Sequence, residues 1–123
     1  MKVIQTDAAP AAIGPYSQGI VSGNLVFTSG QIPLDPKTGE VAGDHIAGQA
    51  EQAIANLKAV LEAAGSSLNK VIKTSCFLAD MNHFAGFNEV YAKHFPGKPA
   101  RSTIAVRQLP LSVLVEIEAI AEL

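Results

Sequence analysis

The sequence lacks most features that mark disulfide-stabilised or nucleic-acid-binding proteins. Its 123 residues include one cysteine, Cys76, so neither an intrachain disulfide nor a multi-cysteine zinc site can form. Nine residues are basic, only two of them arginines, and the net charge is −2. Because nucleic-acid affinity depends largely on Lys and Arg neutralising phosphates, we expect no nucleic-acid partner.

Long apolar segments and targeting signals are also missing. No run of about 18 apolar residues occurs, so we expect no membrane span. The N-terminus lacks the basic and apolar regions of a signal peptide, and we expect a cytoplasmic protein. Charged residues are scarce, at 16% of the chain, while 48% are hydrophobic. An oligomer is one way to bury the excess apolar surface.

Recognisable metal and cofactor motifs are absent as well. The three histidines, His45, His83 and His94, show none of the common close ligand spacings. There is no GxGxxG motif, phosphate-binding loop or GxSxG elbow. We therefore expect neither a metal nor a cofactor, and we interpret His83 and His94 as surface residues. Cys76, among apolar neighbours, is interpreted as a buried thiol rather than a nucleophile.

The hydrophobic pattern predicts alternating strands and helices. Strands are predicted at 18–22, 25–29, 71–79, 102–106 and 113–121. Apolar residues at three- and four-residue steps predict a helix over 46–64, and a second helix is predicted to run from Asp80 to Phe95. Asp44 and Asp80 are the expected N-caps, and Gly65 is expected to end the first helix.

These elements pack most economically as one α/β domain over residues 1–123, with a single sheet and both helices on one face. The other face then has no cover. Yet the last predicted strand is apolar on both sides, because Leu114 and Ile120 point away from Val115 and Ile117. We infer that the uncovered face is buried against another copy of the chain. The alternative is a monomer whose sheet tolerates exposed leucine and isoleucine.

Two of the four candidate functional segments lie near the N-terminus. Gly14 and Pro15 form a rigid corner that places Tyr16 before a strand, as a structural anchor or as a pocket wall with a hydroxyl donor. Ser29 ends the predicted strand 25–29, and Gly30 follows it directly. A glycine there indicates either a bulge or a ligand that approaches the backbone closely. The pattern leaves both interpretations open at each position.

The other two candidates carry charge. Arg101 follows a Pro-stiffened loop, where its guanidinium suits two-point binding of a carboxylate; the alternative is a surface arginine paired with an acid. Glu116 lies with Glu118 in an otherwise apolar strand. Such acids usually form a solvated edge. On a face buried in an oligomer, however, Glu116 could orient or deprotonate a water molecule.

Taken together, these segments resemble the reactive intermediate deaminase (RidA/YjgF) family. The resemblance rests on four motifs, IGPYSQ at 13–18, TSGQIP at 28–33, PARS at 99–102 and VEIEAIA at 115–121. They occur in the family's order and spacing over nearly the whole chain. The segments EAAG at 62–65 and NEVY at 88–91 also look like the family's intervening segments.

The resemblance implies a fold, an assembly and an activity. The fold is chorismate-mutase-like, and the assembly is a homotrimer whose sheets line the interior and whose active sites lie between subunits. The activity is the hydrolysis of 2-imino or enamine acids, such as 2-iminobutanoate and 2-iminopropanoate or its enamine 2-aminoacrylate, to 2-oxo acids and ammonia. No cofactor is implied, and the expected ligands are small 2-imino and 2-oxo acids.

The resemblance also assigns residue roles. Arg101 matches the arginine that binds the substrate carboxylate, and Glu116 matches the glutamate associated with the attacking water. Tyr16, Ser29 and Gly30 match positions that line the pocket. Thr103 stands where many family members have cysteine, and hydrolysis survives this difference if the position acts through its backbone carbonyl.

Other functions compete with this hypothesis. A non-catalytic module could bind 2-oxo acids through the same arginine and act as a regulator. Ribonuclease or translation-inhibitor activity has been ascribed to some family members, but the low basic content counts against it here. A chaperone-like role is a further possibility that sequence cannot address.

Overall fold

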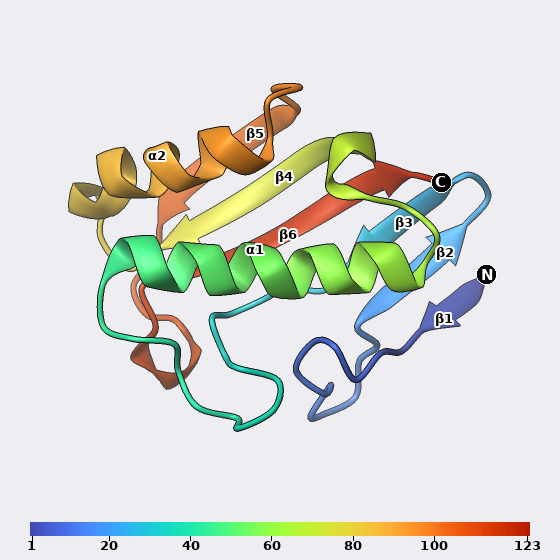
Figure 1. Cartoon of the computed structure of the whole chain (residues 1–123), viewed down its shortest axis with the longest axis horizontal. Helices are drawn as coiled ribbons and strands as arrows, with labels where there is room; N and C mark the ends of the chain where they lie inside the picture. The colour runs from blue at the N-terminus through green and yellow to red at the C-terminus, as the bar shows by residue number, and fades with distance from the viewer.

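The computed structural model describes all 123 residues and shows one mixed sheet with two α-helices on one face (Figure 1). The strands are β1 (Lys2–Ile4), β2 (Gly19–Ser22), β3 (Leu25–Thr28), β4 (Val71–Leu78), β5 (Ala100–Ala105) and β6 (Val115–Glu122). Their order is β1-β2-β3-β6-β4-β5, and only β4 and β5 pair in parallel. The predicted single sheet with both helices on one face is confirmed.

The helices are α1 (Ile46–Ala63) and α2 (Phe84–His94). The prediction that Asp44 caps α1 is wrong. The helix begins at Ile46, as predicted, but its N-cap residue is His45, which makes no side-chain capping bond, and Asp44 lies 3.3 Å from the His45 ring. Gly65 follows α1 with φ of +86°, a left-handed conformation that glycine adopts at little cost, as predicted.

Three smaller features refine the predicted elements. Asp80 caps a short 3₁₀ helix, Met81–His83, by accepting a hydrogen bond from the Asn82 backbone N–H at 2.8 Å, and α2 follows directly. The last strand begins at Val115 rather than Val113, because a 3₁₀ turn at Pro110–Ser112 precedes it. Strand β1, which pairs with β2, was not predicted: its three residues are too few to show periodicity.

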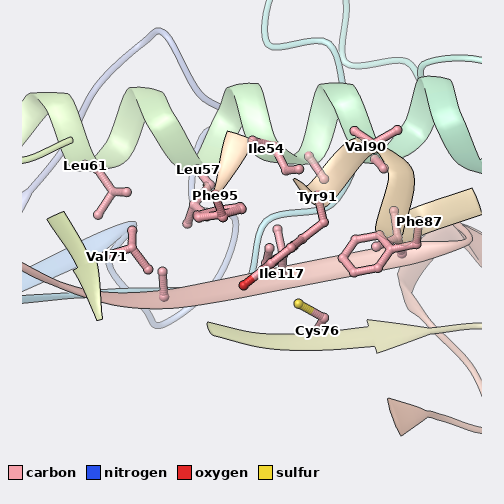
Figure 2. Packing of buried hydrophobic residues seen from close by; sticks show 14 of the residues in the cluster. Ile54, Leu57, Leu61, Val71, Cys76, Phe87, Val90, Tyr91, Phe95 and Ile117 are labelled. Carbon is pink, nitrogen blue, oxygen red and sulfur yellow. The ribbon is translucent and has the colours of Figure 1, made fainter. Parts of the chain in front are cut away.

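The main core fills the space between the helices and the sheet (Figure 2). From α1 it contains Ile54, Leu57 and Leu61, and from β6 it contains Ile117. Strand β6 alternates strictly between buried and more accessible residues, as expected for a strand with one face under the helices. No helix combines the length and apolar character needed to cross a membrane.

The opposite face of the sheet has no cover within the chain. Phe27 and Ile104 are 41% and 53% exposed. Phe27 pairs with Ile120, and Ile104 pairs with Phe77, so apolar side chains extend across this face from β3 to β5. We call it the open face. That another copy of the chain covers this face stays a prediction.

One buried amide joins α1 to the loop that follows β3. Asn56 is 1% exposed, and its Nδ2 donates to the carbonyl oxygens of Ile32 at 3.0 Å and Leu34 at 2.9 Å. Gln52, one turn earlier, donates to Asn56 Oδ1 at 2.9 Å. These bonds hold the loop that carries Gly30 against the helix.

Replacing Asn56 with alanine should lower the free energy of unfolding by about 2–3 kcal/mol, because two buried carbonyl groups lose their donor. Urea titrations followed by circular dichroism, at one protein concentration, measure this loss. Gln52→Ala is the matched control on the same helix and should cost less than about 1 kcal/mol. Equal losses in the two variants would contradict a tethering role for Asn56.

Candidate functional site

The sheet separates the two charged candidate residues. Arg101 pairs in register with Thr74, which is fully buried under the helices, so Arg101 lies on the helix-covered side of the sheet. Glu116 precedes the buried Ile117 and pairs with Phe77, so its side chain lies on the open face. Within one chain the two residues therefore form two separate half-sites, and the sheet lies between them.

The first half-site holds the Arg101 guanidinium between groups of α2. Arg101 Nη1 donates to Asn88 Oδ1 at 2.8 Å. The guanidinium carbon lies 4.7 Å from the centre of the Tyr91 ring and 5.6 Å from that of Phe84. Arg101 makes no ion pair within the chain, which excludes the alternative of an arginine neutralised by a nearby acid. Its charge remains available to a ligand.

A cavity of about 350 Å³ opens beside this guanidinium. It is lined by residues from the second half of α2 and the loop that leads into β5, among them Asn88, Tyr91, Phe95, Lys98 and Arg101. The walls are aromatic rings and prolines with a few polar groups. A concave, partly apolar site that holds the cations Arg101 and Lys98 suits a small anionic ligand.

Thr103 lies two residues beyond Arg101 on the same side of β5. Its Oγ1 is buried without a hydrogen-bond partner in the chain, opposite Cys76 on β4. Strand β5 is an edge of the sheet. The Val106 N–H donates to the Leu78 carbonyl of β4 at 2.9 Å. Because the backbone N–H and C=O groups of successive strand residues point to opposite sides, those of Thr103, three residues earlier, point away from β4 to the free edge of the sheet. Its backbone, not its hydroxyl, is accessible there.

The second half-site places a carboxylate against a glycine. A Cβ atom added at Gly30 would collide with Oε2 of Glu116 and crowd the rest of that carboxylate. The Gly30 loop is fixed in this position because the N–H and C=O of Gln31 both bond to the Ile117 backbone, at 2.8 and 3.0 Å. A side chain at position 30 would displace the Glu116 carboxylate, so the group that approaches this glycine within the chain is Glu116. The approach of a ligand to the Gly30 backbone stays a prediction.

The environment of Glu116 favours its protonated form. Burial raises the pKa of the Glu116 carboxyl, and the neighbouring Glu118 carboxylate raises it further. Glu116 has no ion-pair partner within the chain. A carboxylate with a raised pKa and no fixed counter-charge is a stronger base than an ordinary surface glutamate.

Tyr16 and Ser29 flank the same half-site. With Gly30, Pro110 and Glu116 they line a cavity of about 430 Å³ on the open face. The Ser29 hydroxyl donates to the Ser17 carbonyl at 2.5 Å, which fastens the turn at 13–17 to the end of β3. Gly14, with φ of +130°, forms that turn, and Tyr16 is left 52% exposed. Four of the six predicted site residues thus lie together.

Sequence reasoning did not single out the residues that hold Arg101. Asn88 and Tyr91 lie three positions apart on α2, and Phe84 lies four positions before Asn88, so all three share one side of the helix. The signal that could have found Asn88 is a polar residue next to the aromatic stripe. Pro110, between the last two predicted strands, was not singled out either, although it lines the Glu116 cavity.

The remaining reactive groups are placed as predicted or away from both half-sites. Burial raises the pKa of the Cys76 thiol to about 11, so this fully buried thiol stays protonated and is no nucleophile. His94 lies 3.0 Å from Glu51 on the outer side of the helices, so it is a paired rather than a free surface histidine. No group of three or more His, Cys, Asp or Glu side chains is arranged to hold a metal ion.

Comparison with known proteins covers both half-sites. The sequence profile of the family described as Endoribonuclease L-PSP matches residues 6–123. A RutC family protein of Pyrococcus horikoshii is 57% identical over 121 residues, covering 98% of this chain and 96% of that protein. The 2-iminobutanoate/2-iminopropanoate deaminase of Escherichia coli K12 is 51% identical over 124 residues, covering 98% and 96%.

A solved structure gives the same result at the level of the fold. The crystal structure of E. coli TdcF with bound serine is similar with a TM-score of 0.95 and 47% sequence identity, covering 100% of this chain and 99% of that chain. The resemblance first recognised in four short motifs is thus confirmed over nearly the full length. The chain belongs to the Endoribonuclease L-PSP family, which includes the YjgF, RutC and RidA proteins.

Proposed function

We propose that this protein is a hydrolytic deaminase of small 2-imino and enamine acids, which it converts to 2-oxo acids and ammonia. The observation that carries the proposal is the pair of half-sites: a guanidinium with no internal counter-charge, and a carboxylate of raised pKa seated on Gly30. Further support comes from the 51% identical E. coli relative, which carries the name of such a deaminase.

The chemistry needs little beyond these two groups. The Arg101 guanidinium binds the substrate carboxylate, which places the imine carbon at a fixed distance from the cation. Ionised Glu116 accepts a proton from a water molecule, whose oxygen attacks that carbon. The protonated imine thereby becomes a carbinolamine, whose nitrogen takes the proton from Glu116. As the C–N bond breaks and ammonia leaves, Glu116 accepts the hydroxyl proton and the C=O bond forms, so that one water is consumed, one ammonia is released and one proton passes to the solvent.

A second copy of the chain would unite the half-sites. Arg101 lies at the free edge of the sheet and Glu116 on the open face, so an edge of one chain placed on the open face of the next brings the two together. We propose a homotrimer in which each of three equivalent sites takes Arg101 from one chain and Glu116 from its neighbour. Rotational assembly of this kind closes a ring and covers the exposed Phe27 and Ile104.

Small carboxylates are the ligands that this arrangement favours. The relative TdcF was solved with bound serine, a compound of the expected size with a carboxylate. The Thr103 backbone at the free edge adds a hydrogen-bonding group close to Arg101. Because this group belongs to the backbone, threonine can supply it as well as cysteine.

The decisive assay generates the imine in place. A threonine dehydratase or an amino-acid oxidase supplies the imino acid, and formation of the 2-oxo acid is followed with and without this protein. Acceleration supports the proposal. Binding of 2-oxobutanoate without faster ammonia release would identify a non-catalytic binding module instead, and cleavage of RNA without imine hydrolysis would identify the ribonuclease alternative.

Mixing two inactive variants tests whether the site is shared. Arg101→Ala and Glu116→Gln should each lower kcat/KM by about 100-fold or more. After equal amounts are unfolded and refolded together, about one quarter of the sites should combine an intact arginine with an intact glutamate. Imine hydrolysis should therefore return to about one quarter of the wild-type rate.

The matched control mixes wild-type protein with the double variant Arg101→Ala/Glu116→Gln. Sites shared between chains should leave about one quarter of the activity, whereas sites within one chain would leave about half. A mixture of single variants that stays inactive, together with half activity in this control, would contradict the shared site.

The pH profile tests the role of Glu116. Because only the ionised carboxylate can accept the proton, kcat/KM should rise with pH through the pKa of Glu116, which burial and Glu118 raise above its ordinary value. Glu118→Gln removes the repelling charge, so this rise in kcat/KM, the acidic limb of the profile, should move to lower pH. Glu116→Gln should lower kcat about 100-fold and abolish the limb. An unchanged limb in Glu116→Gln would rule out the water-activating role.

Replacing Gly30 with alanine tests the seating of the carboxylate. The added Cβ would collide with the Glu116 carboxylate and displace it, so kcat should fall about tenfold or more, with little change in the affinity for 2-oxobutanoate. Gly97→Ala is the matched control, because a Cβ there meets nothing within 4 Å. Full activity in Gly30→Ala would show that the Glu116 position is not needed.

A further inference from the structure

We infer that Tyr91 is a positioning residue for carboxylate binding: its ring supports the Arg101 guanidinium, and a hydroxyl bond to Thr74 fixes the ring. This inference rests on the proposed role of Arg101 and extends it to a residue of the cavity wall that acts through the arginine. Three contacts, from α2, β4 and β5, carry it.

The first contact is between ring and cation. The guanidinium carbon lies 4.7 Å from the centre of the Tyr91 ring, within the range of a cation–π interaction. A guanidinium is weakly hydrated and planar, so it lies on aromatic surfaces at little desolvation cost. Arg101 Nη1 is already bonded to Asn88. A ring beneath the group and a bond at one of its nitrogens together restrict its orientation and leave the remaining N–H donors for a ligand.

The second contact fixes the ring itself. The Tyr91 and Thr74 hydroxyl groups are 2.7 Å apart, and Thr74 is fully buried. Figure 2 shows the Tyr91 side chain extending from α2 toward the sheet, with its hydroxyl at the tip. The Phe95 ring stacks on Tyr91, with centroids 4.4 Å apart and an interplanar angle of 28°. Burial raises the pKa of Tyr91, so the phenol stays protonated and can donate.

The third contact is the strand pairing that joins Thr74 to Arg101. Thr74 is the residue of β4 that pairs directly with Arg101 of β5. The hydroxyl bond therefore attaches the ring to the strand position next to the arginine's own backbone. Phenylalanine at position 91 would supply the same ring but would leave the Thr74 hydroxyl with only the Cys76 thiol, at 3.8 Å. The Tyr91 ring contacts the Arg101 guanidinium, and the Tyr91 hydroxyl fixes the orientation of that ring.

A pre-oriented guanidinium loses less freedom when it binds a carboxylate, so Tyr91 should affect affinity more than the chemical step. Tyr91→Leu should raise KM, and the Kd for 2-oxobutanoate, about tenfold, with kcat within about twofold of wild type. Tyr91→Phe should restore both constants to within about threefold. Thr74→Val should resemble Tyr91→Phe, and Thr74→Ser, which keeps the hydroxyl, should resemble wild type.

Leu57→Ala is the control for loss of packing in the same core. Leu57 is fully buried on α1 and does not line the cavity beside Arg101. Its replacement should lower the melting temperature and leave the Kd for 2-oxobutanoate within about twofold of wild type. A purely structural role for Tyr91 would instead give Leu57→Ala and Tyr91→Leu the same effect on Kd, and that result would overturn the inference.

A double-mutant cycle tests whether Tyr91 acts through Arg101. In an Arg101→Gln background, where the cation is absent, Tyr91→Leu should change the Kd for 2-oxobutanoate by less than about twofold. The same tenfold loss in both backgrounds would overturn the inference. A protein that binds 2-oxobutanoate with these dependences but does not hydrolyse imines would refute the deaminase proposal alone. Imine hydrolysis with unchanged KM in Tyr91→Leu would refute the positioning role alone.

Discussion

The helices of this chain cover one face of the sheet only, and side chains along a strand alternate between its faces. These two constraints determine where the charged residues can lie. Arg101 pairs with a residue under the helices, and Glu116 with a residue on the open face, so no rotamer change can bring them together within one chain. The fold thereby requires a neighbour if both groups are to act on one small molecule.

The same arrangement explains why both charges stay unneutralised. Arg101 is held by an amide oxygen and two aromatic rings, which orient a cation without cancelling its charge. Glu116 lies against the backbone of Gly30 and near another acid, which raises its proton affinity. An internal ion pair would have stabilised either group but would have competed with a substrate carboxylate or lowered the basicity of Glu116.

Much of the fold could be predicted from the sequence because its elements have strong periodicity. The apolar stripe after Ile46 and the alternation in β6 each required a buried face, and both are found. Short-range features were less predictable. Asp44 is a favourable capping residue, yet the N-cap of α1 is His45, and β1 is too short to show a pattern.

The site was predicted residue by residue but not in its arrangement. Tyr16, Ser29, Gly30 and Glu116 lie around one cavity because β3 and β6 are adjacent, a pairing that a single sequence does not specify. That Arg101 lies across the sheet from them depends on the β4–β5 register, and a shift of one residue would have reversed its face. The motifs therefore predicted which residues form the site, but not the strand order and register that decide on which face of the sheet each one lies.

Two of the buried polar side chains in this small domain support the two half-sites. Asn56 holds the loop of Gly30, and Thr74 holds the ring beneath Arg101. An apolar residue would fill either position without the cost of burying a polar group, so packing alone does not account for them. Each bond instead specifies one position for a segment that contacts a charged residue. Orientation of the segments that contact Arg101 and Glu116, in addition to stability, accounts for these two polar residues.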